Sequence, residues 1–177
     1  QEPIEPGASF TYHFPVNDAG TFWYHSHNKA WEQVARGLYG ALIVTEDESE
    51  ISARDVVLLA DDWRLNKDFA IDERSFRSVH DWSHAGRLGN WLTINGQSKP
   101  DIHLPNKGQV RFRLINAANA RKLSFQFGNK QKFRVISLDG APCKPFSAET
   151  MTLGPAQRAD IIVDINKSLN AIYEVST

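Results

Sequence analysis

Apolar and polar side chains alternate along much of this chain with the period of two that is typical of β-strands. Between Ser9 and Val16 an apolar side chain occupies every second position, and the turn-forming residues 17–20 separate this segment from Thr21 to His27. The pattern therefore predicts a hairpin of two strands. Residues 30–36 are predicted to form one helical turn, and Tyr39 to Thr45 a buried strand.

A second unit begins at Ile51, after the acidic run 46–50, which has the composition of a solvated linker. Its first strand is predicted at Asp55 to Asp61. The long connection from Asp62 to about Asn90 is either functional or packed over another part of the protein. Many short strands separated by turn signals predict an all-β Greek-key sandwich or barrel. These further strands are Trp91–Asn95, Gln109–Asn116, Leu123–Phe127, Phe133–Leu138, Glu149–Leu153, Arg158–Ile165 and Ala171–Ser176.

The two units share an internal repeat. A shift of 149 residues (159 − 10) places Phe10–Val16 on Ala159–Ile165. One extra residue in the following turn aligns the next strands, where the second unit has Val175 and Thr177 in place of two histidines of the first unit. The repeat predicts one fold present twice, with the second copy lacking those histidines.

Composition excludes several classes of partner. The 177 residues suffice for a little more than one typical domain. Twenty basic and twenty-one acidic side chains leave a net charge of −1, so neither nucleic acid nor an anionic membrane is expected as a partner. No apolar run reaches the roughly 18 residues of a membrane span, and the first residues carry no export signal. The chain starts at Gln1 without a methionine, as a processed or excised chain would.

Two histidines at the end of the second predicted strand form a candidate metal-ligand pair. Because strand side chains alternate between faces, His25 and His27 project from one face and Ser26 from the other. Imidazole nitrogens bind copper, zinc, iron or nickel, so the pair alone indicates a transition metal without selecting one. One alternative is a pair of surface histidines. Another is the HxHxDH pattern of zinc hydrolases, which would need an aspartate and a histidine where this chain has Lys29 and Ala30.

The flanking residues select among these readings. The stretch 20–27 reads GTFWYHSH and residues 37–44 read GLYGALIV, and together they closely resemble the second histidine motif of the multicopper oxidases, the laccase-like family. Four phrases of the second unit look like the middle cupredoxin domain of three-domain members of this family. They are Asn95–Gln97, Arg111–Ala117, Leu138–Pro142 and Leu153–Asp160. Their order and spacing extend the resemblance over nearly the whole chain.

The resemblance implies copper as the cofactor and a cupredoxin-like Greek-key β-sandwich as the fold. Residues 1–50 would form the C-terminal part of cupredoxin domain 1, and residues 51–177 would form a copper-free cupredoxin domain 2 that lacks its last strand. In the family, electrons from a reducing substrate pass from a mononuclear copper to a three-copper cluster, where dioxygen is reduced to water. His25 and His27 match ligands of the binuclear coppers in that cluster.

The expected partners follow from the same resemblance: dioxygen, a small reducing substrate (a phenol, an amine or a metal ion) and the remaining cupredoxin domains of the parent protein. The resemblance also suggests a periplasmic or secreted location. Two other classes stay open, a copper-binding or electron-transfer module and a structural relative that has lost copper. Exposed apolar faces at Phe10, Phe14, Phe22 and Trp23 predict association of the isolated chain into an oligomer.

Four other candidate ligands are interpreted as structural or surface residues. The single cysteine, Cys143, cannot form an internal disulfide, and it has no neighbouring histidine to match the blue-copper cysteine of the family. Met151 lies in a predicted strand and suits the core better than an axial ligand position. His13 falls on the face of its segment opposite the aromatic side chains, and His103 has no ligand set beside it.

The long connection contains a second pair of histidines. His80 and His84 are four residues apart, which is a ligand spacing only on a helix, and Asp81 or Ser83 could satisfy them by hydrogen bonds. We interpret this pair as structural. Other side chains of the connection are candidates for shaping a substrate mouth: Trp82, Arg87 and Trp91.

Overall fold

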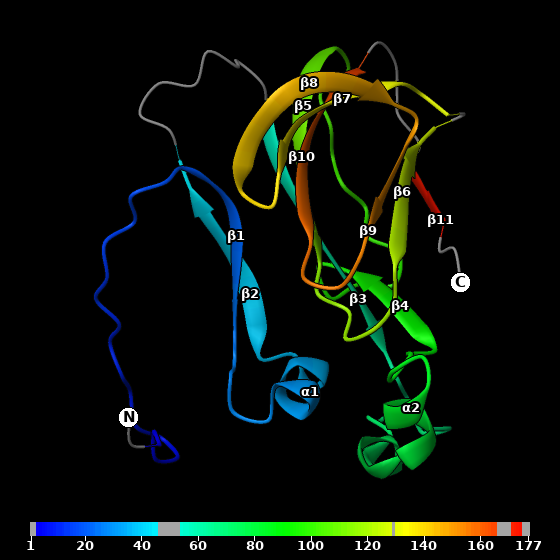
Figure 1. Ribbon diagram of the computed structural model, residues 1–177. Coiled ribbons are helices and arrows are strands. Elements are labelled where there is room, and N and C mark those ends of the chain that lie inside the picture. Colours follow the sequence, from blue (N-terminus) through cyan, green and yellow to red (C-terminus); the bar gives the residue numbers. More distant parts are fainter. Residues whose placement is uncertain (1–2, 46–53, 129, 166–170, 175–177) are drawn as a thin grey trace.

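The computed structural model describes residues 3–45, 54–128, 130–165 and 171–174 (Figure 1). The predicted acidic linker, the predicted start of the second unit at Ile51 and the positions of Val175 and Thr177 lie outside these residues. Strands dominate the described part, and the predicted all-β fold is confirmed. None of its helices is long and apolar enough to cross a membrane.

The first unit is a two-stranded antiparallel sheet. β1 (Gly20–His25) pairs with β2 (Tyr39–Val44), with Gly20 opposite Val44 and His25 opposite Tyr39. The connection contains α1 (Ala30–Gln33) and the 3-10 helix η1 (Val34–Arg36). Gly37 follows with a φ of 88°, a left-handed conformation that turns the chain into β2. The predicted helical turn and the predicted strand are therefore confirmed, but β2 is half-buried along its whole length rather than buried.

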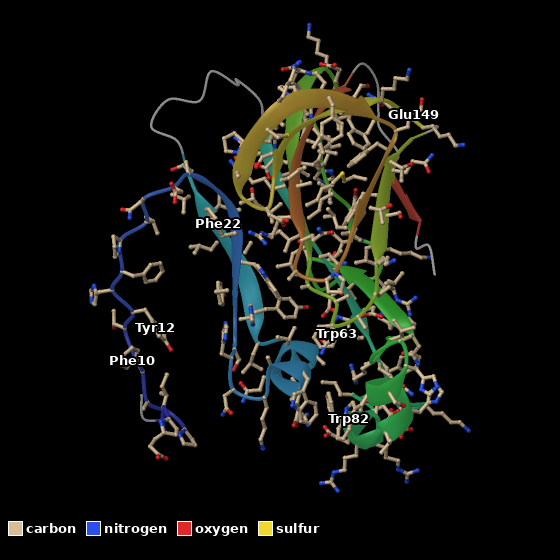
Figure 2. The ribbon with its side chains drawn as sticks, in the orientation of Figure 1. Phe10, Tyr12, Phe22, Trp63, Trp82 and Glu149 are labelled. Atoms are coloured by element: carbon tan, nitrogen blue, oxygen red, sulfur yellow. The ribbon has the colours of Figure 1, made fainter. Side chains whose placement is uncertain are left out.

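The predicted hairpin of residues 9–27 is wrong. β1 pairs with β2, and among the described residues no strand partner is found for Ser9 to Val16. This segment runs extended along the outside of the molecule, where Phe10, Tyr12 and Phe14 are 50–63% exposed (Figures 1 and 2). Alternation places side chains on two faces, but a strand also needs a neighbour for its backbone hydrogen bonds.

The second unit is a sandwich of two sheets. One has six strands in the order β4-β3-β5-β10-β7-β8 and the other three in the order β11-β6-β9. β3 and β5 are parallel, and the other pairs are antiparallel. The strands are β3 (Arg54–Trp63), β4 (Trp91–Ile94), β5 (Gly108–Asn116), β6 (Leu123–Phe127), β7 (Phe133–Leu138), β8 (Ala141–Ala148), β9 (Thr150–Leu153), β10 (Arg158–Ile165) and β11 (Ala171–Glu174).

The hydrophobic core lies between these two sheets. Phe112 on β5 and Phe127 on β6 meet at 4.7 Å between ring centroids, which joins the facing layers, and Leu114, Val135 and Ile161 are fully buried around them. The predicted β-sandwich is thereby confirmed by its packing. Except for β8, the strands of this unit were all predictable, with boundaries displaced by at most two residues within the described part.

Strand β8 has no counterpart among the predicted strands. It contains Pro142 and Pro145, which cannot donate backbone hydrogen bonds and therefore argue against a strand in sequence. β8 lies at the edge of the six-stranded sheet, and β7 is its only strand neighbour among the described residues. An edge strand has one side without a neighbour, so it tolerates proline there.

The long connection between β3 and β4 is partly helical. It contains the 3-10 helix η2 (Glu73–Arg77) and α2 (Val79–Ser83). Each begins with a side-chain cap: Asp72 accepts from the backbone N–H of Arg74, and Ser78 accepts from that of Asp81. Both capping residues can be read from the sequence. The residues that follow them lack the helical spacing of apolar side chains, so the sequence did not predict these helices.

The two units meet tightly at β1. Gly20 lies against the turn between β7 and β8, where a Cβ would overlap the backbone carbonyl of Gly140. Gly140 has a φ of 88°, and the ring of Phe22 packs where a Cβ of residue 140 would lie. Contrary to the prediction of exposed apolar faces, Phe22 and Trp23 are half-buried.

Candidate metal centre

Three aromatic rings stack on one face at the end of β1. Trp23 stacks on His25 with 4.4 Å between ring centroids, and His25 stacks on His27 at 4.8 Å with an interplanar angle of 15°. The period of two places all three on the same side of the strand. His25 is half-buried and His27 is exposed. The structure thus brings together the two predicted ligands as parallel imidazoles, with Trp23 behind them.

A backbone contact orients the His25 ring. Its Nδ1 lies 3.0 Å from the carbonyl oxygen of Ser26. A carbonyl oxygen only accepts hydrogen bonds, so Nδ1 carries the proton in the neutral ring. The lone pair is then on Nε2, which is the atom free to bind a metal.

Ser26 holds the loop that carries His27. Its Oγ donates to the side chain of Gln33 on α1 and accepts from the backbone N–H of Asn28 at 3.2 Å. The backbone N–H of Ser26 also reaches the carbonyl of Leu38 at 3.3 Å. The segment beyond the end of β1 is therefore tied to the helix that follows it.

Behind the stack the half-buried phenol of Tyr39 meets the buried carboxylate of Asp61. The hydroxyl of Tyr39 donates to Asp61 Oδ2 at 2.5 Å, and the rings of Tyr39 and Trp23 are 6.4 Å apart. Burial raises the pKa of Asp61 to about 7, although the hydrogen bonds from Tyr39 and from the backbone of Asp62 act in the opposite direction. Burial and the negative charge of Asp61 also raise the pKa of Tyr39 above its usual range.

The sequence interpretation did not identify Asp61 as anything more than the end of a strand. The available signal was the pair of adjacent carboxylates, Asp61 and Asp62, at the end of an apolar strand. Both are buried, and Asp62 pairs with Arg121 at 2.8 Å. Charged groups in such a position need partners, which marks them as structurally or chemically important.

The donor set suits copper or another transition metal, because imidazole nitrogen is a ligand for these ions. Within the described residues no group of three or more His, Cys, Asp or Glu side chains is placed to hold a metal ion. A metal at this centre would therefore receive two imidazoles, those of His25 and His27, from the described part of the chain.

The other single candidates lie apart from this pair. Cys143 on β8 and Met151 on β9 are half-buried and pack against the core of the sandwich. The Cys143 Sγ contacts the carbonyl of Val135 at 4.0 Å. His13 and His103 are exposed.

The connection between β3 and β4 contributes one wall of a separate cavity of about 350 Å³. Trp82 and Arg87 line it together with Trp31 of α1 (Figure 2), and the rings of Trp31 and Trp82 meet edge to face at 6.0 Å. Trp91 lies elsewhere, against Phe69 at 5.7 Å. Two of the three side chains expected at a substrate mouth thus share one cavity.

Comparison with known proteins agrees with the motif and the fold. A family profile described as multicopper oxidase matches residues 1–49, and a second profile of the same description matches residues 54–177. The chain is 30% identical over 190 residues to Laccase-3 of Arabidopsis thaliana, covering 98% of this chain and 32% of that protein. It is also 30% identical over 175 residues to the cell division protein FtsP of Photorhabdus laumondii, covering 93% of this chain and 36% of that protein.

A solved structure extends the agreement. The multi-copper oxidase of Pseudomonas thermotolerans matches with a TM-score of 0.85 and 30% identity, over 97% of this chain and 42% of that chain. The present chain spans about a third of the length of the curated relatives named above. Its histidine motif, its sandwich fold and both family profiles point the same way, and the chain belongs to the multicopper oxidase family, whose cofactor is copper.

Proposed function

We propose that this chain is part of an oxidase that couples one-electron oxidation of a reducing substrate to the reduction of dioxygen to water. In the complete protein, His25 and His27 ligate the binuclear coppers of a three-copper cluster. The observation that carries this proposal is the pair of parallel imidazoles, 4.8 Å apart, of which His25 presents Nε2 as its free nitrogen.

In this proposal, the residues of this chain bind copper and hold its two imidazole ligands in position. The carbonyl of Ser26 holds the His25 ring in one tautomer, and the Trp23 ring restricts its rotation. The Ser26 side chain fixes the loop that carries His27 against α1. Copper bound by these imidazoles would supply the one-electron and oxygen chemistry of the family.

We also propose the domain organisation that this function requires. Residues 1–50 are the C-terminal part of one cupredoxin domain, and residues 51–177 are a second, copper-free domain. The two family profiles support this boundary, because the first ends at residue 49 and the second begins at residue 54. The remaining ligands belong to other cupredoxin domains of the parent protein. The substrate is a small phenol, amine or metal ion, and the protein works in the periplasm or outside the cell.

Oxygen uptake and copper content test the proposal. In the full-length protein, His25→Ala and His27→Ala should each lower the copper content and abolish oxygen uptake with a phenolic substrate. His13→Ala is the matched control, because His13 is exposed and lies outside the stack. Full copper content and full uptake in both ligand variants would contradict the assignment.

A second candidate is a copper-binding or structural cupredoxin-like protein without oxidase activity. The observation that favours it is the similarity to a relative named as a cell division protein, which is as identical to this chain as the laccase is. Full-length protein that lacks oxygen uptake with phenols, amines and metal ions, whether or not it contains copper, would support this candidate over the oxidase.

A further inference from the structure

A second pair of imidazoles, apart from the candidate copper ligands, comes from His80 in α2 and from His84, the residue at the C-terminal end of that helix. The rings of His80 and His84 stack with 4.2 Å between centroids and an interplanar angle of 25°. Both residues are exposed. The sequence interpretation required a helix before this spacing could place two ligands together. α2 supplies the turn between the two histidines, although His84 itself is the C-cap residue and lies outside the helix.

The His84 ring is held by two hydrogen bonds at one nitrogen. Its Nδ1 lies 3.0 Å from the carbonyl oxygen of His80 and 3.0 Å from the Oγ of Ser83. The carbonyl must accept, so Nδ1 carries the proton and Nε2 has the lone pair. Ser83 Oγ can accept from Nδ1 because its own hydrogen is directed to the carbonyl of Val79 at 2.9 Å. Such a hydrogen bond on the distal nitrogen is typical of metal-binding histidines.

The carboxylate between the two histidines does not compete for this site. Asp81 is buried and its Oδ2 pairs with Arg64 at 2.6 Å. The two imidazoles are therefore presented at the exposed C-terminal end of α2, and an ion bound there would complete its coordination with water.

We propose that His80 and His84 form a surface site for a divalent transition-metal ion of the class Cu²⁺, Ni²⁺ or Zn²⁺, distinct from the His25 and His27 centre. Imidazole selects this class over Ca²⁺ and Mg²⁺, which prefer oxygen ligands. α2 contacts α1 through the ring pair of Trp82 and Trp31 (Figure 2). The site therefore lies near the helix that follows the copper-ligand motif, and it places a second ion at the same end of the molecule (Figure 1).

Zinc titration of the copper-loaded, untagged full-length protein tests this site. Isothermal titration calorimetry should detect a Zn²⁺ site whose Kd rises at least about tenfold in His80→Ala and in His84→Ala, because each variant loses one of two protein ligands. His103→Ala is the control, since it removes an exposed histidine for which the described residues show no stacked ring. An unchanged Kd in His80→Ala and His84→Ala, or an equal loss in His103→Ala, would overturn the proposal.

A residue-resolved measurement checks the same site independently. Zn²⁺ should protect His80 and His84 against carbethoxylation by diethylpyrocarbonate, as read by mass spectrometry, while His103 stays reactive. Repeating both measurements in His25→Ala separates this site from the proposed copper centre, because the Zn²⁺ site should persist there. Equal reactivity of His80 and His84 with and without Zn²⁺ would contradict the proposal.

Discussion

Thr21 Oγ1 donates a 2.6 Å hydrogen bond to Asp160 Oδ1, across 139 positions of sequence, and both residues are fully buried. Asp160 also pairs through Oδ2 with Arg111 at 2.6 Å and with Arg113 at 3.3 Å, and Arg113 in turn pairs with Asp55 at 2.6 Å. The strand that carries His25 is therefore attached to the sandwich through one buried carboxylate.

The first prediction concerns this attachment. Thr21→Val removes the hydroxyl that bonds Asp160 and accepts from Arg113 at 2.9 Å. Leaving buried polar groups without that partner should lower the free energy of unfolding by about 1–3 kcal/mol. Chemical denaturation of the full-length protein measures it, with the exposed Thr150→Val as the matched control. Equal stability of the two variants would contradict the role of the hydroxyl.

The second prediction concerns pH and Asp61. Its pKa in the folded protein is about 7, above the value of about 3.9 for an unfolded chain, so the folded state disfavours ionisation. The contribution of Asp61 to stability is thus fully present below about pH 4 and is lost as the pH rises through about 7. The difference of the two pKa values predicts that the free energy of unfolding falls by about 4 kcal/mol between about pH 4 and about pH 7.

Asp61→Asn isolates this contribution. Asparagine keeps an acceptor for the backbone N–H of Asp62 and does not titrate, so the variant should gain stability relative to the native protein as the pH rises from 4 to 7. Unfolding of both proteins at several pH values provides the comparison. A stability difference that stays constant over this range would show that the pKa of Asp61 is not raised.

The third prediction concerns the ring stack. Trp23→Ala removes the surface on which His25 rests at 4.4 Å and should weaken copper binding by about tenfold. Trp23→Phe retains an aromatic face and should restore most of the affinity, which a loss of general stability would not produce. Copper content after dialysis against a graded chelator reports both variants. Identical copper retention in Trp23→Ala and the native protein would exclude a positioning role for Trp23.

The fourth prediction concerns association. Phe10, Tyr12, Phe14 and Val16 are 50–63% exposed along the N-terminal segment (Figure 2). If residues 1–177 are produced alone, this apolar row should drive self-association, and Phe10→Ser combined with Phe14→Ser should reduce it. Sedimentation at several concentrations gives the measurement, with Phe69→Ser as the control for a single exposed ring. A stable monomer at high concentration would contradict the prediction.

The sequence alone determined the features that depend on local periodicity. Apolar residues bounded by turn signals predicted β6 and β7, for example, because each has a buried face, and the period of two predicted that His25 and His27 share a face. Both predictions depend only on the alternation of side chains between the two faces of a strand. The family motif then selected copper among the metals that imidazole can bind.

The tertiary structure decided whatever depends on a partner distant in sequence. The segment Ser9–Val16 has the pattern of a strand but finds no neighbour to pair with in the described part of the chain, whereas β8 forms despite two prolines because β7 lies beside it. The pKa of Asp61 depends on its burial, and Asp160 joins the two units through Thr21. Backbone pairing and desolvation are set by residues far away along the chain, and a local pattern carries no information about them.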